Sequence, residues 1–172
     1  GEGVVTGKPT LIQFNEEANE HEFYMVHPNG EEEAIGEEQY KQLVSERGKI
    51  KVSQMKFFRI CLAAKRLAGG GHIFKSMASN NIELLDTPGL GGPYWKDREI
   101  LREWVKEFRL IILCIKATEI NSRVADQVNP FLKLTTSPVI LSLTFWDKWK
   151  EGEDYAGIKD EYDARKKAKD LI

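Results

Sequence analysis

The sequence predicts an α/β fold with a mostly parallel sheet that carries helices on both faces. Segments with strand character alternate along the chain with segments of helical periodicity. Two central strand candidates, residues 110–116 and 139–144, are almost continuously apolar, which is typical of strands buried on both faces. In such sheets ligands bind beyond the carboxyl ends of the strands, so the residues that follow each strand are the candidate functional residues.

The composition is that of one soluble domain or of a large piece of a bigger one. The chain has 172 residues, of which 41% are hydrophobic and 30% charged, and its net charge is −2. This charge argues against a nucleic-acid partner, and no apolar run is long enough to cross a membrane. We expect a cytoplasmic protein in which Cys61 and Cys114 are small core residues, with a single disulfide as the alternative.

The first half of the chain is predicted from local patterns. The expected elements are strands at 10–14 and 23–27, helices at 37–47 and 54–67, and strands at 73–78 and 82–86. A turn is expected at Pro28-Asn29-Gly30. The helix at 54–67 depends on the spacing of Met55 and Phe58 along one side, and three glycines follow it.

The second half repeats the alternation of helix and strand. The expected elements are a helix at 97–108, a strand at 110–116, a helix at 122–134, a strand at 139–144 and a helix at 158–172. Pro130 leaves the end of the helix at 122–134 open.

The most informative stretch is residues 82–92, which reads IELLDTPGLGG. An apolar run leads to Asp86, and a Pro-Gly turn and more glycine follow. A carboxylate at the end of a strand can hold Mg²⁺ through water, and a glycine lets a backbone N–H approach a γ-phosphate. Asp86-Thr87-Pro88-Gly89 fits the DxxG pattern of GTPases, with ordinary turn chemistry as the alternative.

Two further segments place this pattern in a context. Residues 1–6 read GEGVVT with Pro9 after them, and residues 144–147 read TFWD before the acidic stretch KEGED at 150–154. The opening resembles the switch I core of the dynamin family, and TFWD resembles the Thr-Lys-x-Asp guanine element. The whole chain resembles the central part of a dynamin-like GTPase domain, from switch I to just past the guanine-recognition element. This resemblance implies a P-loop-GTPase-like fold in an incomplete domain.

The resemblance implies catalytic and metal-binding roles for residues at both matched switches. Thr6 would coordinate Mg²⁺ through its hydroxyl and contact the γ-phosphate, and Asp86 would hold Mg²⁺ through water. The carbonyls of Gly1 and Gly3 would help position a sodium or potassium ion that offsets charge developing during hydrolysis.

The same resemblance implies that GTP is the substrate and GDP the product. The N–H of Gly89, in the loop formed with Thr87 and Pro88, would sense the γ-phosphate. Thr144 opens the guanine element, and Asp147 would accept two hydrogen bonds from guanine that adenine cannot donate.

The sequence departs from the family pattern in two places. Phe145 stands where the guanine element has a lysine. An aromatic ring can still cover the base, but the replacement weakens the expectation of guanine specificity. No Walker A segment is present, because no strand precedes Gly7-Lys8 and Pro9 removes an N–H from a possible phosphate cradle. We assign Lys8 to solvent or to the switch loop, expect the phosphate loop upstream of Gly1, and expect the isolated chain to bind nucleotide weakly.

Two functions follow as alternatives. The first is GTP hydrolysis in a dynamin-like membrane-remodelling GTPase that reaches membranes through regions outside this sequence. Such a protein would form a homodimer across the nucleotide face or a higher oligomer, and Tyr94 and Trp95 mark either that face or an anchor for the following helix. Trp146 and Trp149 either line a base pocket or pack against a helix. The second function is a non-hydrolysing, GTPase-like protein-interaction module.

Overall fold

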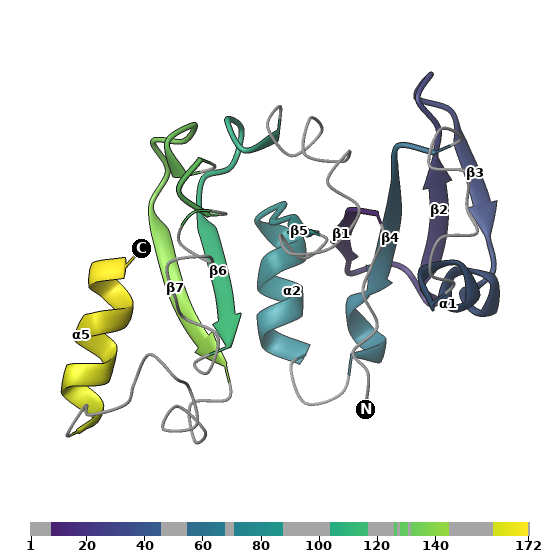
Figure 1. The fold of residues 1–172 in the computed structure, drawn as a ribbon. Helices are drawn as coiled ribbons and strands as arrows, with labels where there is room; N and C mark the ends of the chain where they lie inside the picture. The colour runs from purple at the N-terminus through teal and green to yellow at the C-terminus, as the bar shows by residue number, and fades with distance from the viewer. Residues whose placement is uncertain are drawn as a thin grey trace. The chain divides into compact units, whose positions relative to one another are not determined.

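The chain divides into two compact units, Gly1–Tyr94 and Trp95–Ile172, each with its own sheet (Figure 1). In this computed structural model the described residues are 8–45, 55–67, 71–87, 104–116, 126, 128–130, 132–144 and 160–171. Among them no helix is both long enough and apolar enough to cross a lipid bilayer.

The first unit contains a five-stranded sheet in the order β3-β2-β4-β1-β5. Its elements are, in chain order, β1 (Thr10–Asn15), β2 (Glu22–Val26), β3 (Glu32–Ile35), α1 (Glu37–Ser45), β4 (Phe57–Ala63), the 3₁₀ helix η2 (Ala64–Arg66), α2 (Gly71–Ser79) and β5 (Leu84–Asp86). Only β1 and β4 run parallel, while β2–β3, β2–β4 and β1–β5 are antiparallel pairs.

The predicted mostly parallel, P-loop-GTPase-like sheet is therefore wrong. One physical reason lies in the turn at Pro28-Asn29-Gly30, which was predicted correctly and joins β2 to β3. Such a short connection can join only antiparallel neighbours, because parallel strands need a crossover of a dozen residues or more. Gly30 has a φ of 86° and donates its N–H to the His27 carbonyl at 2.9 Å, which closes the hairpin.

Two elements of this unit have the opposite type from the one predicted. Residues 54–67 were expected to form a helix, but β4 is a strand at the centre of the sheet. Residues 73–78 were expected to form a strand, but they lie in α2, where Phe74 stacks on Phe14 of β1 with ring centroids 5.5 Å apart. Both segments are short, so their apolar residues fit the period of a helix and the period of a strand. The contacts made in the sheet decide which of the two forms.

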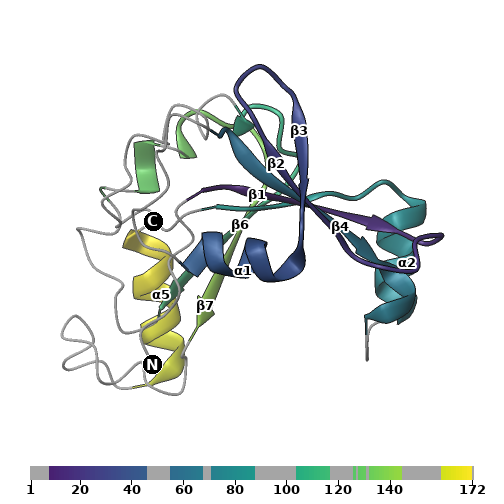
Figure 2. The same cartoon turned by 90° about the vertical axis from the view of Figure 1, so that its right-hand side faces the viewer.

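The core of the first unit lies between the sheet and α1, which contacts β2 (Figure 2). Phe23, Phe58 and Ile60 are buried there, and the rings of Tyr40 and Phe58 form a T-shaped contact with their centroids 5.2 Å apart. Alternation along β4 places Arg59 on the other face.

That other face is polar where β2, β3 and β4 meet. The Arg59 guanidinium lies 4.2 Å from the centre of the Tyr24 ring and pairs with the Glu32 carboxylate, and its Nη1 donates to Gln13. This arrangement suits a sheet with one face towards the core and one towards water. It explains why this part of the sheet does not carry the helical layers expected on both faces.

The second unit contains a two-stranded parallel sheet and a helix. Strands β6 (Ile111–Lys116) and β7 (Val139–Thr144) pair in register from Ile111 with Val139 to Lys116 with Thr144, and α5 spans Glu161–Leu171. Asp160 caps α5, since its Oδ1 accepts the Asp163 N–H at 2.9 Å. These three elements confirm the strands predicted at 110–116 and 139–144 and the last helix. Residues 97–103 of the helix predicted at 97–108 lie outside the described residues. In the helix predicted at 122–134, the described residues 126, 128–130 and 132 are helical.

Candidate functional site

The end of α2 sets the direction in which the chain enters β5. Asn81 has a φ of 50°, in the left-handed region that asparagine tolerates. Its N–H donates to the Ala78 carbonyl at 3.0 Å, and the Ile82 N–H reaches back to the Met77 carbonyl at 2.8 Å. These bonds close the last turn of the helix and lead the chain into the short strand that ends at Asp86.

Pairing between β5 and β1 then places Asp86 opposite Thr10. Thr10 is only 1% exposed, and its hydroxyl makes no hydrogen bond of normal geometry among the described residues, although it lies close enough to the Tyr40 hydroxyl to influence the Tyr40 pKa. Most buried polar groups in proteins do have a partner, and an exception often indicates an ordered water, an ion or a catalytic role. The carboxylate and the buried hydroxyl are both hard oxygen donors, which is the chemistry that Mg²⁺ prefers.

Tyr40 of α1 is the third polar residue of this site. Burial raises the pKa of the Tyr40 hydroxyl, the nearby Thr10 hydroxyl lowers it, and the Asp86 charge raises it. The tyrosine ring is held between Phe23 and Phe58, at 5.2 Å from the centroid of each. The packed ring therefore holds the Tyr40 hydroxyl near the Thr10 hydroxyl and the Asp86 carboxylate.

The Asp86 carboxyl itself is perturbed. Burial raises its pKa, and a hydrogen bond from the Thr87 backbone N–H opposes this rise. The residue still has contact with solvent, so its carboxyl is desolvated on one side and open on the other. An acidic group that is partly desolvated at the end of a strand is suited to receive a cation.

Replacing Thr10 with valine tests whether its buried hydroxyl lowers the stability of the fold. We expect the Thr10→Val variant to raise the free energy of unfolding by about 1 kcal/mol, because it removes a buried hydroxyl that makes no hydrogen bond of normal geometry. Urea denaturation followed by far-UV circular dichroism measures this change, and Thr87→Val, at an exposed position, is the control. A loss of stability in Thr10→Val would mean that the hydroxyl has a partner in solution.

Only part of the predicted site lies within the described residues. Asp86 and Thr87 lie together at the end of β5, whereas Thr144 lies in the other unit, at the end of β7. The Thr144 hydroxyl points back to its own sheet, where it donates to the Ile115 carbonyl at 3.4 Å. The predicted residues outside the described ranges are Gly1, Gly3, Thr6, Pro88, Gly89 and Asp147.

Three further expectations can be compared with the described residues. Lys8 was assigned to solvent or the switch loop, but it is buried and only 5% exposed. Cys61 is buried as expected, whereas Cys114 is exposed, and both are free thiols. In the part of the chain that the structure describes, no three His, Cys, Asp or Glu residues are grouped so that they could hold a metal ion. A hydrated Mg²⁺ needs fewer, because it binds through one or two carboxylates and keeps several waters.

Sequence reasoning identified Asp86 but missed Thr10 and Tyr40. Thr10 and Tyr40 lie near Asp86 because β1 pairs with β5 and α1 packs on the sheet. Both are contacts between distant parts of the sequence. One local signal was available, because Thr10 starts an alternating strand whose next same-side residues, Ile12 and Phe14, are apolar. The chain matches no protein-family model and no curated protein sequence.

Proposed function

We propose that this chain takes part in GTP binding and hydrolysis within a dynamin-like, membrane-remodelling GTPase. The single observation that carries the proposal is the position of Asp86, which ends β5 opposite the buried Thr10 hydroxyl. Support also comes from the order of the GEGVVT, DTPG and TFWD segments along the sequence. The proposal rests on the site and these segments, and the sheet type gives it no support.

Each residue of the site would have its own role in holding Mg²⁺ and the nucleotide. The Asp86 carboxylate would help to hold Mg²⁺ through water, and the hydrogen bond from the Thr87 N–H would help to orient that carboxylate. Mg²⁺, when bound, neutralises charge on the phosphates. Thr10 and Tyr40 set the polarity on the buried side of the carboxyl.

Residues outside the described ranges complete the proposal. Thr6 would contact Mg²⁺ and the γ-phosphate, and the Gly89 N–H would sense that phosphate. The carbonyls of Gly1 and Gly3 would hold a sodium or potassium ion, and Asp147 would select guanine. A homodimer across the nucleotide face, and a peripheral association with membranes through other regions, belong to the same proposal.

Nucleotide binding by the full-length protein tests this function directly. We expect mant-GTP fluorescence to rise saturably in the presence of Mg²⁺, with GTP displacing the probe better than ATP. Chelating Mg²⁺ with EDTA should weaken binding of mant-GTP. Absence of Mg²⁺-dependent binding in a folded protein would contradict the proposal.

A non-hydrolysing interaction module is the second candidate. It is favoured by apolar side chains that are open to solvent on one face of the second unit, where Ile112 is 58% and Ile140 51% exposed. Paired residues of β6 and β7 bring these two isoleucines side by side. Exposed apolar groups that gather in one place are typical of protein-binding surfaces. A folded protein that binds no nucleotide would favour this function over the first.

A further inference from the structure

The tip of the β2–β3 hairpin carries a reactive pair of residues. Asn29-Gly30 is the only asparagine–glycine pair in the sequence, and both residues are exposed. A side-chain amide can be attacked by the peptide nitrogen of the next residue, and a glycine there leaves the approach open because it has no Cβ. No described atom lies within 4 Å of the position that a Cβ of Gly30 would take. The turn therefore offers the Asn29 amide an accessible nucleophile.

A hydrogen bond within the turn favours this attack. The Asn29 Oδ1 accepts the Glu31 N–H at 3.0 Å, and this bond spans Gly30, so it folds the side chain back towards the Gly30 nitrogen. The same N–H polarises the side-chain carbonyl and would stabilise the negative charge that develops on its oxygen during attack. One contact opposes the reaction, because the Gly30 N–H donates to the His27 carbonyl at 2.9 Å and must first be released. That bond lies at an exposed hairpin tip, where local opening costs little free energy.

We propose that Asn29 is a site of spontaneous deamidation in the folded protein. Hydroxide removes the Gly30 amide proton, the nitrogen forms a bond to the Asn29 Cγ, and ammonia leaves with a proton from water. One water molecule then adds to either carbonyl carbon of the resulting succinimide, and the bond from that carbon to the Gly30 nitrogen breaks. The products are aspartate and isoaspartate, no electron is transferred, and water is the only reactant consumed. The proposal does not depend on the nucleotide site.

Either product changes the hairpin. Each adds a carboxylate next to the acidic stretch at 31–33 and makes the net charge of −2 more negative by one unit. Isoaspartate also carries the main chain through its Cβ, which lengthens the turn by one methylene group and disturbs the bond from Gly30 to His27. Strand β3 has four residues and lies at the edge of the described sheet, where it pairs with β2. Deamidation should therefore loosen β3 and leave the pairing of β1 with β4 intact.

Mass spectrometry of the full chain after incubation in mildly alkaline buffer tests the proposal. Cleavage after glutamate releases residues 23–31, which contain Asn29 and no other asparagine. We expect this peptide to lose its amide and to show an isoaspartyl form. Asn15 is the internal control, because it is exposed and its Oδ1 accepts the Glu17 N–H at 2.8 Å, but a glutamate follows it. An intact Asn29 amide, or equal loss at Asn15, would overturn the proposal, and a loss confined to urea-unfolded chain would show that the hairpin protects the amide.

Two serine variants provide the matched comparison. Asn29→Ser removes the amide but keeps a side-chain oxygen that can accept the Glu31 N–H, and Asn15→Ser makes the same change at the control position. Protein isoaspartate methyltransferase, supplied with S-adenosylmethionine, labels isoaspartate in the incubated proteins. The label should fall strongly in Asn29→Ser and remain in Asn15→Ser. An undiminished label in folded Asn29→Ser would also overturn the proposal.

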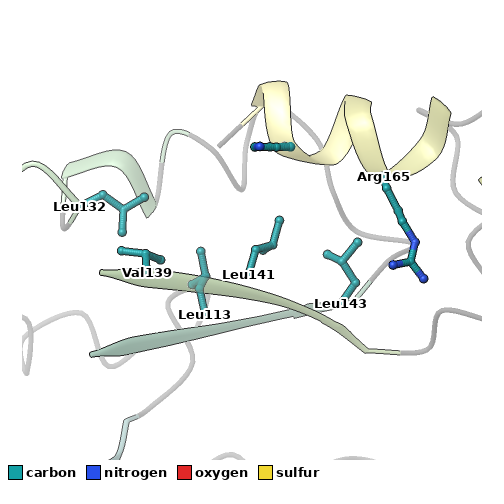
Figure 3. A pocket seen from close by; sticks show the side chains of 7 residues that line it. Leu113, Leu132, Val139, Leu141, Leu143 and Arg165 are labelled. Atoms are coloured by element: carbon teal, nitrogen blue, oxygen red, sulfur yellow. The ribbon is translucent and has the colours of Figure 1, made fainter. Parts of the chain in front are cut away.

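Urea denaturation of fresh and incubated protein measures the effect on the hairpin. The far-UV circular dichroism transition of the incubated wild type should shift to lower urea, and that of incubated Asn29→Ser should not. The second unit, in which Leu113, Leu141 and Leu143 face α5 (Figure 3), contains all four tryptophans. Its tryptophan fluorescence transition should be the same before and after incubation. An equal shift in the wild type and in Asn29→Ser would show that modification of Asn29 does not loosen β3.

Discussion

Replacing Phe58 with alanine should lower the free energy of unfolding of the first unit by about 3–5 kcal/mol. Phe58 is 1% exposed and lies in the central strand β4, where it packs against α1 through the ring of Tyr40. Truncation removes the buried ring and leaves a cavity that neighbours on a hydrogen-bonded sheet cannot easily fill. An effect of this size is comparable with the total stability of many domains.

Urea denaturation followed by far-UV circular dichroism measures this loss. All four tryptophans lie at or after residue 95, in the second unit, so tryptophan fluorescence reports that unit separately. Phe57→Ala is the matched control, because Phe57 is the preceding residue on the opposite, less buried face of β4. We expect the Phe57→Ala variant to lose clearly less stability, and equal losses would mean that α1 does not form the core of the unit.

The success of sequence prediction in this chain depends on how local the deciding interactions are. The strands β6 and β7 were found because their apolar runs are continuous and bounded by turn residues. For β4, the apolar residues Phe58 and Leu62 fit a helical period, and Phe58, Ile60 and Leu62 fit a strand equally well. What makes it a strand is hydrogen bonding to β1 on one side and β2 on the other.

The sheet type could not be read from the sequence for the same reason. Alternation of strands and helices predicts a parallel sheet only if each helix connects two neighbouring parallel strands. Here α1 connects β3 to β4, which are not neighbours in the sheet, and α2 connects β4 to β5, which are separated by β1. The strand that ends at Asp86 was predicted correctly because its pattern is local, whereas its neighbours Thr10 and Tyr40 are brought to it by tertiary packing.

The raised pKa of Asp86 predicts opposite pH dependences for stability and for activity. In an unfolded chain an aspartate titrates near pH 4. Because the folded-state pKa is higher, the contribution of this carboxyl to stability is fully present below pH 4 and is lost as the pH rises through the folded-state value. An Asp86→Asn variant does not titrate, so it should melt at a higher temperature than the wild type at pH 7, with the difference disappearing in acid.

The pH dependence of turnover should be opposite to the pH dependence of stability. If Asp86 holds metal-bound water, only its ionised form works, so kcat/KM for GTP, which reports the free enzyme, should fall as the pH drops through the raised pKa of Asp86. Asp86→Asn should lower kcat by about 100-fold or more at pH 7, since the charge that orients the hydrated metal is gone. Phosphate release by the full-length protein across pH measures both effects. Glu83→Gln, at an exposed carboxylate three residues earlier that bonds Gln13, is the control and should keep wild-type turnover. A more stable Asp86→Asn protein with unchanged turnover would remove Asp86 from the reaction, because it would show that the desolvated carboxyl only weakens the fold.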